Sequence, residues 1–198
     1  VAAATGYIQK YSPDGELLLQ VGERGRYDSS DGTRAGSPLN SDGASFFLPA
    51  AIDVDPDTGE VFVADGELPG GNFRIAVLNE DGEFLRQWSL LRQADEENIF
   101  AGPHCLRLSN DGLVYVCDRS ANQIQVFTQA GQLQQIITGK FVPVTSPAER
   151  ESGNRGNVVV LAFSADPEQK YIYVINQNSV QVEVYERLSG ELLTNFGS

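Results

Sequence analysis

Short apolar runs recur along the chain, and each has the length and composition of a β-strand. Three of them are nearly continuous and rich in β-branched and aromatic residues: EVFVAD (60–65), LVYVCD (113–118) and YIYVIN (171–176). Such runs are typical of strands covered on both faces. Three others alternate, as strands with one wetter face do: RIAVL (74–78), QIQVF (123–127) and VQVEVY (180–185). No segment has a persuasive helical period, so the pattern predicts an all-β protein.

These runs belong to a repeated unit. The frame is strand, turn, strand ending in Asp or Asn, turn, strand, glycine turn, strand. It occurs three times, at 48–88, 102–137 and 157–197, and the start of the chain matches only its second half. The second strands of the three units end at Asp65, Asp118 and Asn176, and the last turns carry Gly15, Gly82, Gly131 and Gly190.

A repeat of four antiparallel strands whose sheets are buried on both faces indicates a β-propeller, in which each sheet is one blade. The predicted blades span 46–90, 102–139 and 157–198, and a half blade spans 5–21. We interpret 1–198 as a single, partial propeller domain. Open blade edges pair readily with other strands, so we expect the remaining blades or another subunit to close the ring.

Composition narrows the class of partner. The formal net charge is −13, which disfavours nucleic acid and anionic lipid surfaces. No apolar run approaches the roughly 20 residues of a membrane-spanning helix. The chain contains no methionine and does not begin with a signal peptide, so we interpret it as a processed product or a fragment.

The strand motifs resemble those of NHL-repeat propellers, which have six blades. The matching features are P-x-x-(I/L)-x-(V/L) in the first strand, V-(F/Y)-V-x-D in the second and N-x-(R/Q)-I-x-V-(F/L) in the third. Within this group the chain is similar to secreted bacterial relatives of the peptidyl-α-hydroxyglycine α-amidating lyase domain. Pro103-His104 and the strand end Cys117-Asp118-Arg119 carry that similarity.

The resemblance implies an extracellular or periplasmic protein and a channel zinc ion with His104 as one ligand. The lyases also use a tyrosine and an arginine. Here Glu67 stands where the tyrosine would follow Asp-Gly, and no arginine matches. His104 is the only histidine, whereas a catalytic zinc site needs three protein ligands. The other ligands would have to lie in blades outside this chain.

Each candidate site residue has a structural alternative. His104 would bind a metal or substrate, or else donate to a backbone carbonyl. Asp65, Asp118 and Asn176 would line a channel as cation acceptors, or else cap backbone N–H groups. Another set would lie at the rim, or else in solvated loops: Glu67, Arg74 and Arg119.

Two further motifs are less ambiguous. Residues 53–60 (DVDPDTGE) resemble a calcium loop, but Thr58 and Ala64 stand where an EF-hand needs glycine and glutamate, so a hairpin turn is expected. Cys105 and Cys117 flank the turn at 109–112 symmetrically, which permits a cross-strand disulfide or two buried thiols.

Three functions follow from these observations. The first is a binding or interaction scaffold that takes a protein or small-molecule ligand at the propeller rim, without enzymatic activity. The second is a zinc-dependent lyase of the α-amidating type with His104 as one metal ligand. The third is a structural subunit of a larger assembly. No cofactor is certain, and zinc and calcium are the candidates.

Overall fold

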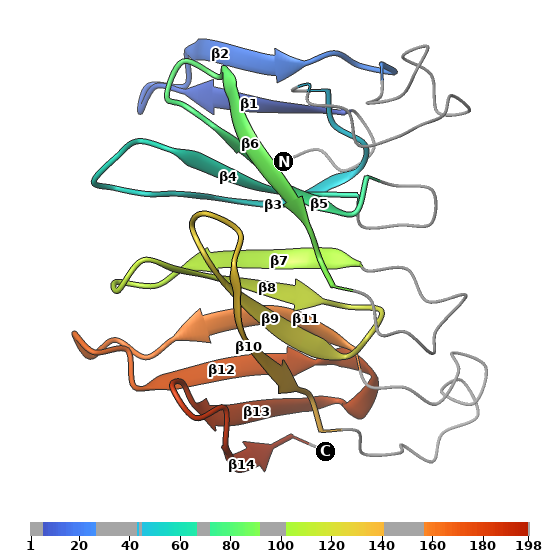
Figure 1. The fold of residues 1–198 in the computed structure, drawn as a ribbon, viewed down its shortest axis with the longest axis vertical. Coiled ribbons are helices and arrows are strands. Elements are labelled where there is room, and N and C mark those ends of the chain that lie inside the picture. Colours follow the sequence, from blue (N-terminus) through green and yellow to red (C-terminus); the bar gives the residue numbers. More distant parts are fainter. Residues whose placement is uncertain are drawn as a thin grey trace. The chain divides into compact units, whose positions relative to one another are not determined.

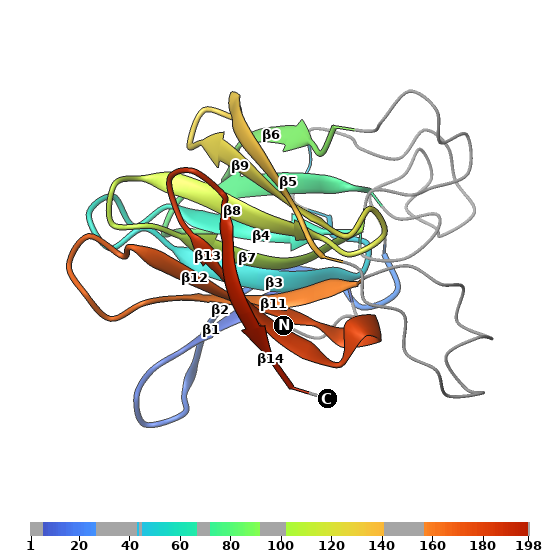
Figure 2. The same cartoon turned by 90° about the horizontal axis from the view of Figure 1, so that it is seen from below.

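The computed structural model describes residues 6–26, 43, 45–66, 72–91, 102–140 and 157–197. The chain divides into two compact units, residues 1–96 (unit 1) and 97–198 (unit 2), and each is considered by itself. Within each sheet the strands follow one another in chain order and pair antiparallel (Figures 1 and 2).

Unit 1 contains two sheets. Sheet I is formed by β1 (Tyr7–Tyr11) and β2 (Leu17–Gly22). Sheet II is formed by four strands: β3 (Pro49–Val54), β4 (Val61–Asp65), β5 (Arg74–Leu78) and β6 (Phe84–Ser89). Ile8 of β1 packs with Val63, Ala76 and Leu78 of sheet II in one apolar core.

Unit 2 contains two four-stranded sheets. Sheet III is formed by β7 (Pro103–Leu108), β8 (Leu113–Asp118), β9 (Gln123–Thr128) and β10 (Leu133–Thr138). Sheet IV is formed by β11 (Val158–Phe163), β12 (Tyr171–Asn176), β13 (Gln181–Glu186) and β14 (Leu192–Phe196), with the 3₁₀ helix η1 (Gln177–Ser179) between β12 and β13. Among the described residues, no helix is long and apolar enough to cross a membrane.

The all-β architecture of four-stranded antiparallel sheets is confirmed. The blade boundaries, the single domain and the six-bladed ring stay predictions. In both units the apolar side chains of one sheet pack against the next, as the apolar second strands require. In unit 2 this core joins Tyr115 and Ile124 of sheet III to Leu161 and Val174 of sheet IV.

Two expectations about strand faces were wrong. The alternating strands β5 and β9 are buried on both faces, apart from Thr128 at the end of β9. Their polar residues are buried because they hydrogen-bond to the aspartate that ends the neighbouring strand. Conversely, β12 is buried on one face only, although its sequence is apolar on both.

The glycine of the last turn marks a close approach between sheets. Gly82 has φ +82°, and a Cβ there would lie 2.4 Å from Cγ2 of Val21 on β2. Gly190 meets Ile137 of β10 in the same way, at 3.0 Å. Sheet I therefore packs on sheet II as sheet III packs on sheet IV.

We expect Gly82→Ala to destabilise the fold more than Gly15→Ala. Both positions have positive φ, but a Cβ at Gly15 meets nothing within 4 Å. Both variants carry the cost of a left-handed alanine, about 1–2 kcal/mol, and Gly82→Ala adds about 1–3 kcal/mol of overpacking. Urea denaturation of both variants measures the difference. Equal losses would contradict the close approach.

Candidate functional site

The candidate site is built around the residues that end the second strand of each four-stranded sheet. Asp65 ends β4, Asp118 ends β8 and Asn176 ends β12, and all three are buried. We call them the strand-end residues. A buried carboxylate or amide needs hydrogen-bond partners, so the partners of these side chains indicate what they do.

Asp65 accepts three hydrogen bonds. They come from the backbone N–H of Phe47 (2.7 Å), Nδ2 of Asn72 (2.7 Å) and Nε of Arg74 (2.9 Å). Burial raises the pKa of Asp65 to about 6, while the charge of Arg74 and the N–H donors oppose that rise. Arg74 is itself buried and donates onward to Gln87 Oε1 at 2.7 Å. A buried ion pair thus joins the end of β4 to the start of β5.

Asp118 has the same position in sheet III, and its partners among the described residues are backbone N–H groups and side-chain amides. Its carboxylate accepts from the backbone N–H groups of Gly102 (2.9 Å) and Ala121 (3.2 Å). The amides of Gln125 and Gln123 on β9 lie at 3.4 and 3.5 Å. Burial raises the pKa of Asp118, and these hydrogen bonds oppose the rise.

Asn176 makes equivalent contacts with a neutral amide. Its Oδ1 accepts from the backbone N–H of Asn157 at 2.9 Å, and its Nδ2 donates to Glu183 Oε1 at 3.0 Å and Lys140 O at 2.9 Å. Tyr185 donates to Glu183 Oε2 at 2.5 Å. Burial is the main cause that raises the pKa of Tyr185, and the hydrogen bond to Glu183 raises it further.

The three strand-end residues therefore share one set of contacts. Each accepts the backbone N–H at the entry of the first strand, from Phe47, Gly102 or Asn157. Each also contacts polar side chains of the third strand. These contacts explain why Asp or Asn recurs here without a ligand, and cation binding by this set stays a prediction.

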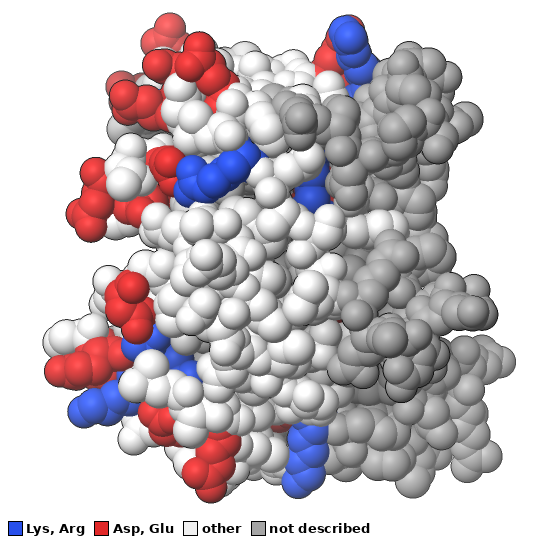
Figure 3. All heavy atoms as spheres, viewed as in Figure 1, with Lys and Arg blue, Asp and Glu red and all other residues white. Residues whose placement is uncertain are grey.

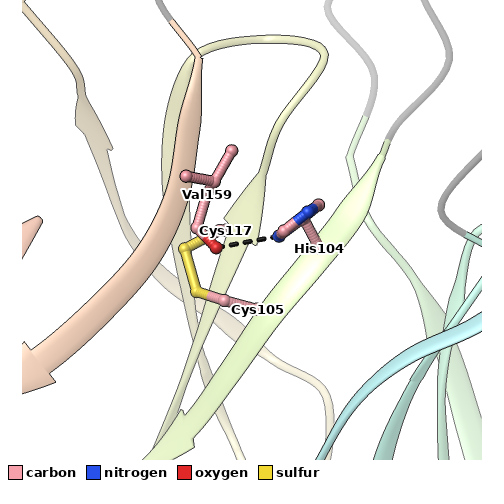
Figure 4. The surroundings of a disulfide bond; sticks show 4 residues. All are labelled: His104, Cys105, Cys117 and Val159. Carbon is pink, nitrogen blue, oxygen red and sulfur yellow. Dashed lines mark hydrogen bonds between the residues drawn. A yellow bond between two sulfur atoms is a disulfide. The ribbon is translucent and has the colours of Figure 1, made fainter. Parts of the chain in front are cut away.

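His104 lies next to a disulfide in unit 2. Its Nδ1 is 2.8 Å from the carbonyl oxygen of Val159 on β11 (Figure 4). A carbonyl only accepts, so Nδ1 carries the proton of this hydrogen bond. Cys105 and Cys117, which are paired across β7 and β8, form a disulfide with a Cα–Cα distance of 4.9 Å.

The donor set does not fit the zinc site that the resemblance implies. His104 is the only histidine of the chain, and both cysteines are consumed in the disulfide. Across the described ranges, no three His, Cys, Asp or Glu side chains form a group that could hold a metal. The role of His104 as a zinc ligand stays a prediction that would need ligands from elsewhere.

The other predicted site residues do not converge. Arg74 is buried in the ion pair with Asp65. Arg119 is half-buried, and its backbone N–H donates to Gly102 O at 2.9 Å. Glu67 lies outside the described residues. Asp55 Oδ1 accepts from the backbone N–H of Asp57 at 2.8 Å, which caps the hairpin turn between β3 and β4.

Sequence reasoning missed a contact between sheets III and IV. Arg187, 5% exposed, forms a bidentate ion pair with Asp111, with N–O distances of 2.9 to 3.0 Å, and donates to Tyr115 Oη at 3.2 Å. Asp111 lies in the turn of sheet III, and its partner is 76 residues away. No local pattern links the two, although an arginine directly after the alternating strand β13 is an available signal.

Comparison with known proteins supports the repeat. The NHL repeat family model matches residues 100–127. The chain is 28% identical over 177 residues to human "NHL repeat-containing protein 3". The aligned region covers 89% of this chain and 43% of the human protein. It is 37% identical over 108 residues to "Peptidyl-glycine alpha-amidating monooxygenase B" of Xenopus laevis. That aligned region covers 52% of this chain and 11% of the Xenopus protein.

Solved structures agree on the fold. A catalytically inactive virginiamycin B lyase from Staphylococcus aureus superposes with a TM-score of 0.61 at 16% identity, over 99% of this chain and 50% of that one. Hydrazine synthase of Kuenenia stuttgartiensis gives 0.62 at 14% identity, over 98% and 43%. At these identities the likeness concerns fold alone, and it confirms the β-propeller class. The chain spans less than half the length of the curated relatives it matches.

We expect Asp65→Asn to lower the free energy of unfolding by about 3–5 kcal/mol, because it leaves the buried guanidinium of Arg74 without its counter-charge. The matched control is Asp81→Asn, an exposed carboxylate in the β5–β6 turn, for which a change within about 0.5 kcal/mol is expected. Urea denaturation measures both. A loss at Asp65 as small as that at Asp81 would show that the ion pair does not hold β4 to β5.

Proposed function

Because this chain is an NHL-repeat β-propeller, we propose that it acts as a binding scaffold outside the cytoplasm whose main partner is a protein. The observation that carries the proposal is an exposed apolar face on sheet IV. The propeller fold by itself does not identify the function, since one fold hosts many functions.

The apolar face of sheet IV is formed by side chains from all four of its strands. Strand register places Val160, Ile175, Val182 and Phe196 in one row across β11, β12, β13 and β14. Val160 is 45% exposed, Ile175 43% and Phe196 55%. Tyr171 and Tyr173 extend the same face along β12. A contiguous apolar face of this kind is typical of a protein-contact surface.

The repeat indicates which surface such a partner would present. Counting back from the strand-end residues, Tyr173 and Ile175 of sheet IV correspond to Tyr115 and Cys117 of sheet III. Tyr115 and Cys117 are buried in the core shared with sheet IV. The exposed face of sheet IV thus corresponds to the face of sheet III against which sheet IV packs. This supports a sheet-like protein partner, and equally the structural-subunit function.

Charge and redox chemistry support the location and the class of partner. The net charge of −13 disfavours nucleic acid. A disulfide between Cys105 and Cys117 is favoured in oxidising compartments and is rare in the cytosol. Together these properties support an extracellular or periplasmic protein whose partners are neutral or basic.

The lyase function has one observation in its favour. The hydrogen bond from Nδ1 of His104 to Val159 O fixes the ring as second-shell partners fix metal-ligating histidines. The remaining ligands have no counterpart among the described side chains, so we derive no catalytic step from it.

Turnover separates the two functions. We expect the chain to release no peptide amide and glyoxylate from a peptidyl-α-hydroxyglycine substrate above the buffer rate, with or without added zinc, and to retain less than one zinc per chain after dialysis. The measurements are product formation by chromatography and metal analysis by mass spectrometry. Zinc-dependent turnover that is lost in His104→Ala would overturn the scaffold function in favour of the lyase.

We expect Ile175→Lys to weaken association through the apolar face of sheet IV. The wild-type chain should associate as its concentration rises, and the lysine variant should stay monomeric, because a charge on this face opposes its burial. Leu188→Lys is the matched control, since Leu188 is 67% exposed in the β13–β14 turn. Sedimentation velocity measures all three. A wild-type chain that stays monomeric like the lysine variant would contradict this assignment.

A further inference from the structure

The outer strand of sheet III, β10, has an open edge in the middle of the chain. Within the part of the chain that the structure describes, β10 pairs with β9 alone. An open edge presents backbone N–H and C=O groups that can pair with another strand, and natural proteins commonly protect it with charged side chains. The charges around β10 therefore indicate whether its edge is protected.

Sheet III lacks the charge that precedes the outer strand in the other sheets. The residue after the turn glycine is an exposed glutamate in sheets I, II and IV, namely Glu16, Glu83 and Glu191. In sheet III this residue is Gln132. No charged residue occurs at 120–139, although 21% of the chain is charged. Figure 3 accordingly shows no charged side chain over the middle of β10. The edge of β10 is thus not protected by charge.

An exposed leucine belongs to the turn that packs on β10. A Cβ at Gly190 in the β13–β14 turn would lie 2.7 Å from Nε2 of Gln135 on β10, and this Nε2 donates to Leu188 O at 3.3 Å. The side chain of Leu188 is 67% exposed. Leu188 stands two residues before the turn glycine, where the other sheets have Pro13, Glu80 and Gln129. Sheet IV thus brings an aliphatic side chain to a place where the other sheets have none.

We propose that the edge of β10 is a strand-addition site for an extended segment of a partner protein. The segment pairs with the backbone of β10 and extends sheet III by one strand, at a spacing of about 4.8 Å. On the face of β10 that bears Gln135, an aliphatic side chain of the segment packs against Leu188. Backbone pairing gives affinity, and the contact with Leu188 gives specificity, as in other cases of strand addition.

The charges beside Leu188 specify the chemistry of the segment. Glu186 and Glu191 flank the β13–β14 turn, and the charge of Arg187 is engaged in its ion pair with Asp111. The whole chain has a net charge of −13. An acidic segment would be repelled, whereas a basic residue next to the aliphatic side chain would be attracted. The site therefore fits a segment that is uncharged along β10 and basic at the end near this turn.

The test uses the 198-residue chain and a labelled peptide, GKTVTVTVTG, which has no acidic side chain and is basic at one end. We expect saturable binding in fluorescence anisotropy, and slower hydrogen exchange of the β10 amides that do not pair with β9. A peptide N-methylated at every valine and threonine should show no saturable binding, because these residues can no longer donate to β10. Glutamate in place of the peptide lysine should weaken binding at low salt, and this difference should shrink at high salt.

Leu188→Gln is the matched variant of the protein, since sheet III has glutamine at the same place. It should weaken binding of the peptide about tenfold, the loss expected for one partly buried leucine. Leu85→Gln, at a leucine of unit 1 that is 44% exposed, should leave the affinity unchanged. Three outcomes would each overturn the proposal: no saturable binding of GKTVTVTVTG, equal binding of the N-methylated peptide, or equal losses in the two glutamine variants.

The edge of β10 is a different surface from the exposed apolar face of sheet IV, because it is the opposite face of sheet IV that packs on sheet III. We therefore expect Ile175→Lys to bind the peptide as the wild-type chain does. Failure of the peptide to bind would leave the proposed function of the sheet IV face untouched, and loss of association in Ile175→Lys would leave the β10 site untouched.

Discussion

The four-stranded sheets depend on one buried polar side chain at the end of the second strand. A buried oxygen there must accept a hydrogen bond, and the backbone N–H at the entry of the first strand donates one to it. The same side chain then contacts the third strand. One residue thereby fixes the ends of three strands, which allows the connecting segments to vary while the sheet keeps its register.

The three sheets satisfy this constraint with different chemistry. Asp65 accepts a hydrogen bond from a buried arginine, and Asp118 accepts hydrogen bonds from glutamine amides and backbone N–H groups. Asn176 has an uncharged amide in this position, and its Nδ2 donates to Glu183. Burial raises the pKa of both Asp65 and Asp118, so both carboxylates keep part of their burial cost, with or without an arginine among the donors described above. Because the partners can differ, the strand-end residue contacts the third strand both in sheet II, where β5 reads RIAVL, and in sheet III, where β9 begins QIQVF.

Much of the fold was predictable because its signals are local. The apolar second strands, the glycine turns and the recurring Asp or Asn lie within one repeat, so they indicated four-stranded antiparallel units. The wetter faces expected of β5 and β9 were wrong because burial of Arg74 and Gln125 depends on a partner on another strand. The exposed face of β12 and the contact of Arg187 with Asp111 depend on packing between sheets, which one repeat does not encode.

The candidate site was predictable in its residues but not in their contacts. The sequence singled out His104, Asp65, Asp118 and Asn176, and left open whether each holds a ligand or the backbone. In the structure all four contact protein groups, while sheet IV of unit 2 presents an exposed apolar face. The corresponding face of sheet III packs on sheet IV, which supports the proposal of a protein that works through protein contacts.

Native-state hydrogen exchange tests the strand-end contact most directly. The backbone amides of Phe47, Gly102 and Asn157 lie at strand entries, yet each donates to a strand-end side chain. If these contacts hold the sheets together, all three amides should exchange as slowly as the central amides of β4, β8 and β12. Exchange of these amides at the rate of the exposed hairpin turns would contradict the role of the strand-end residues.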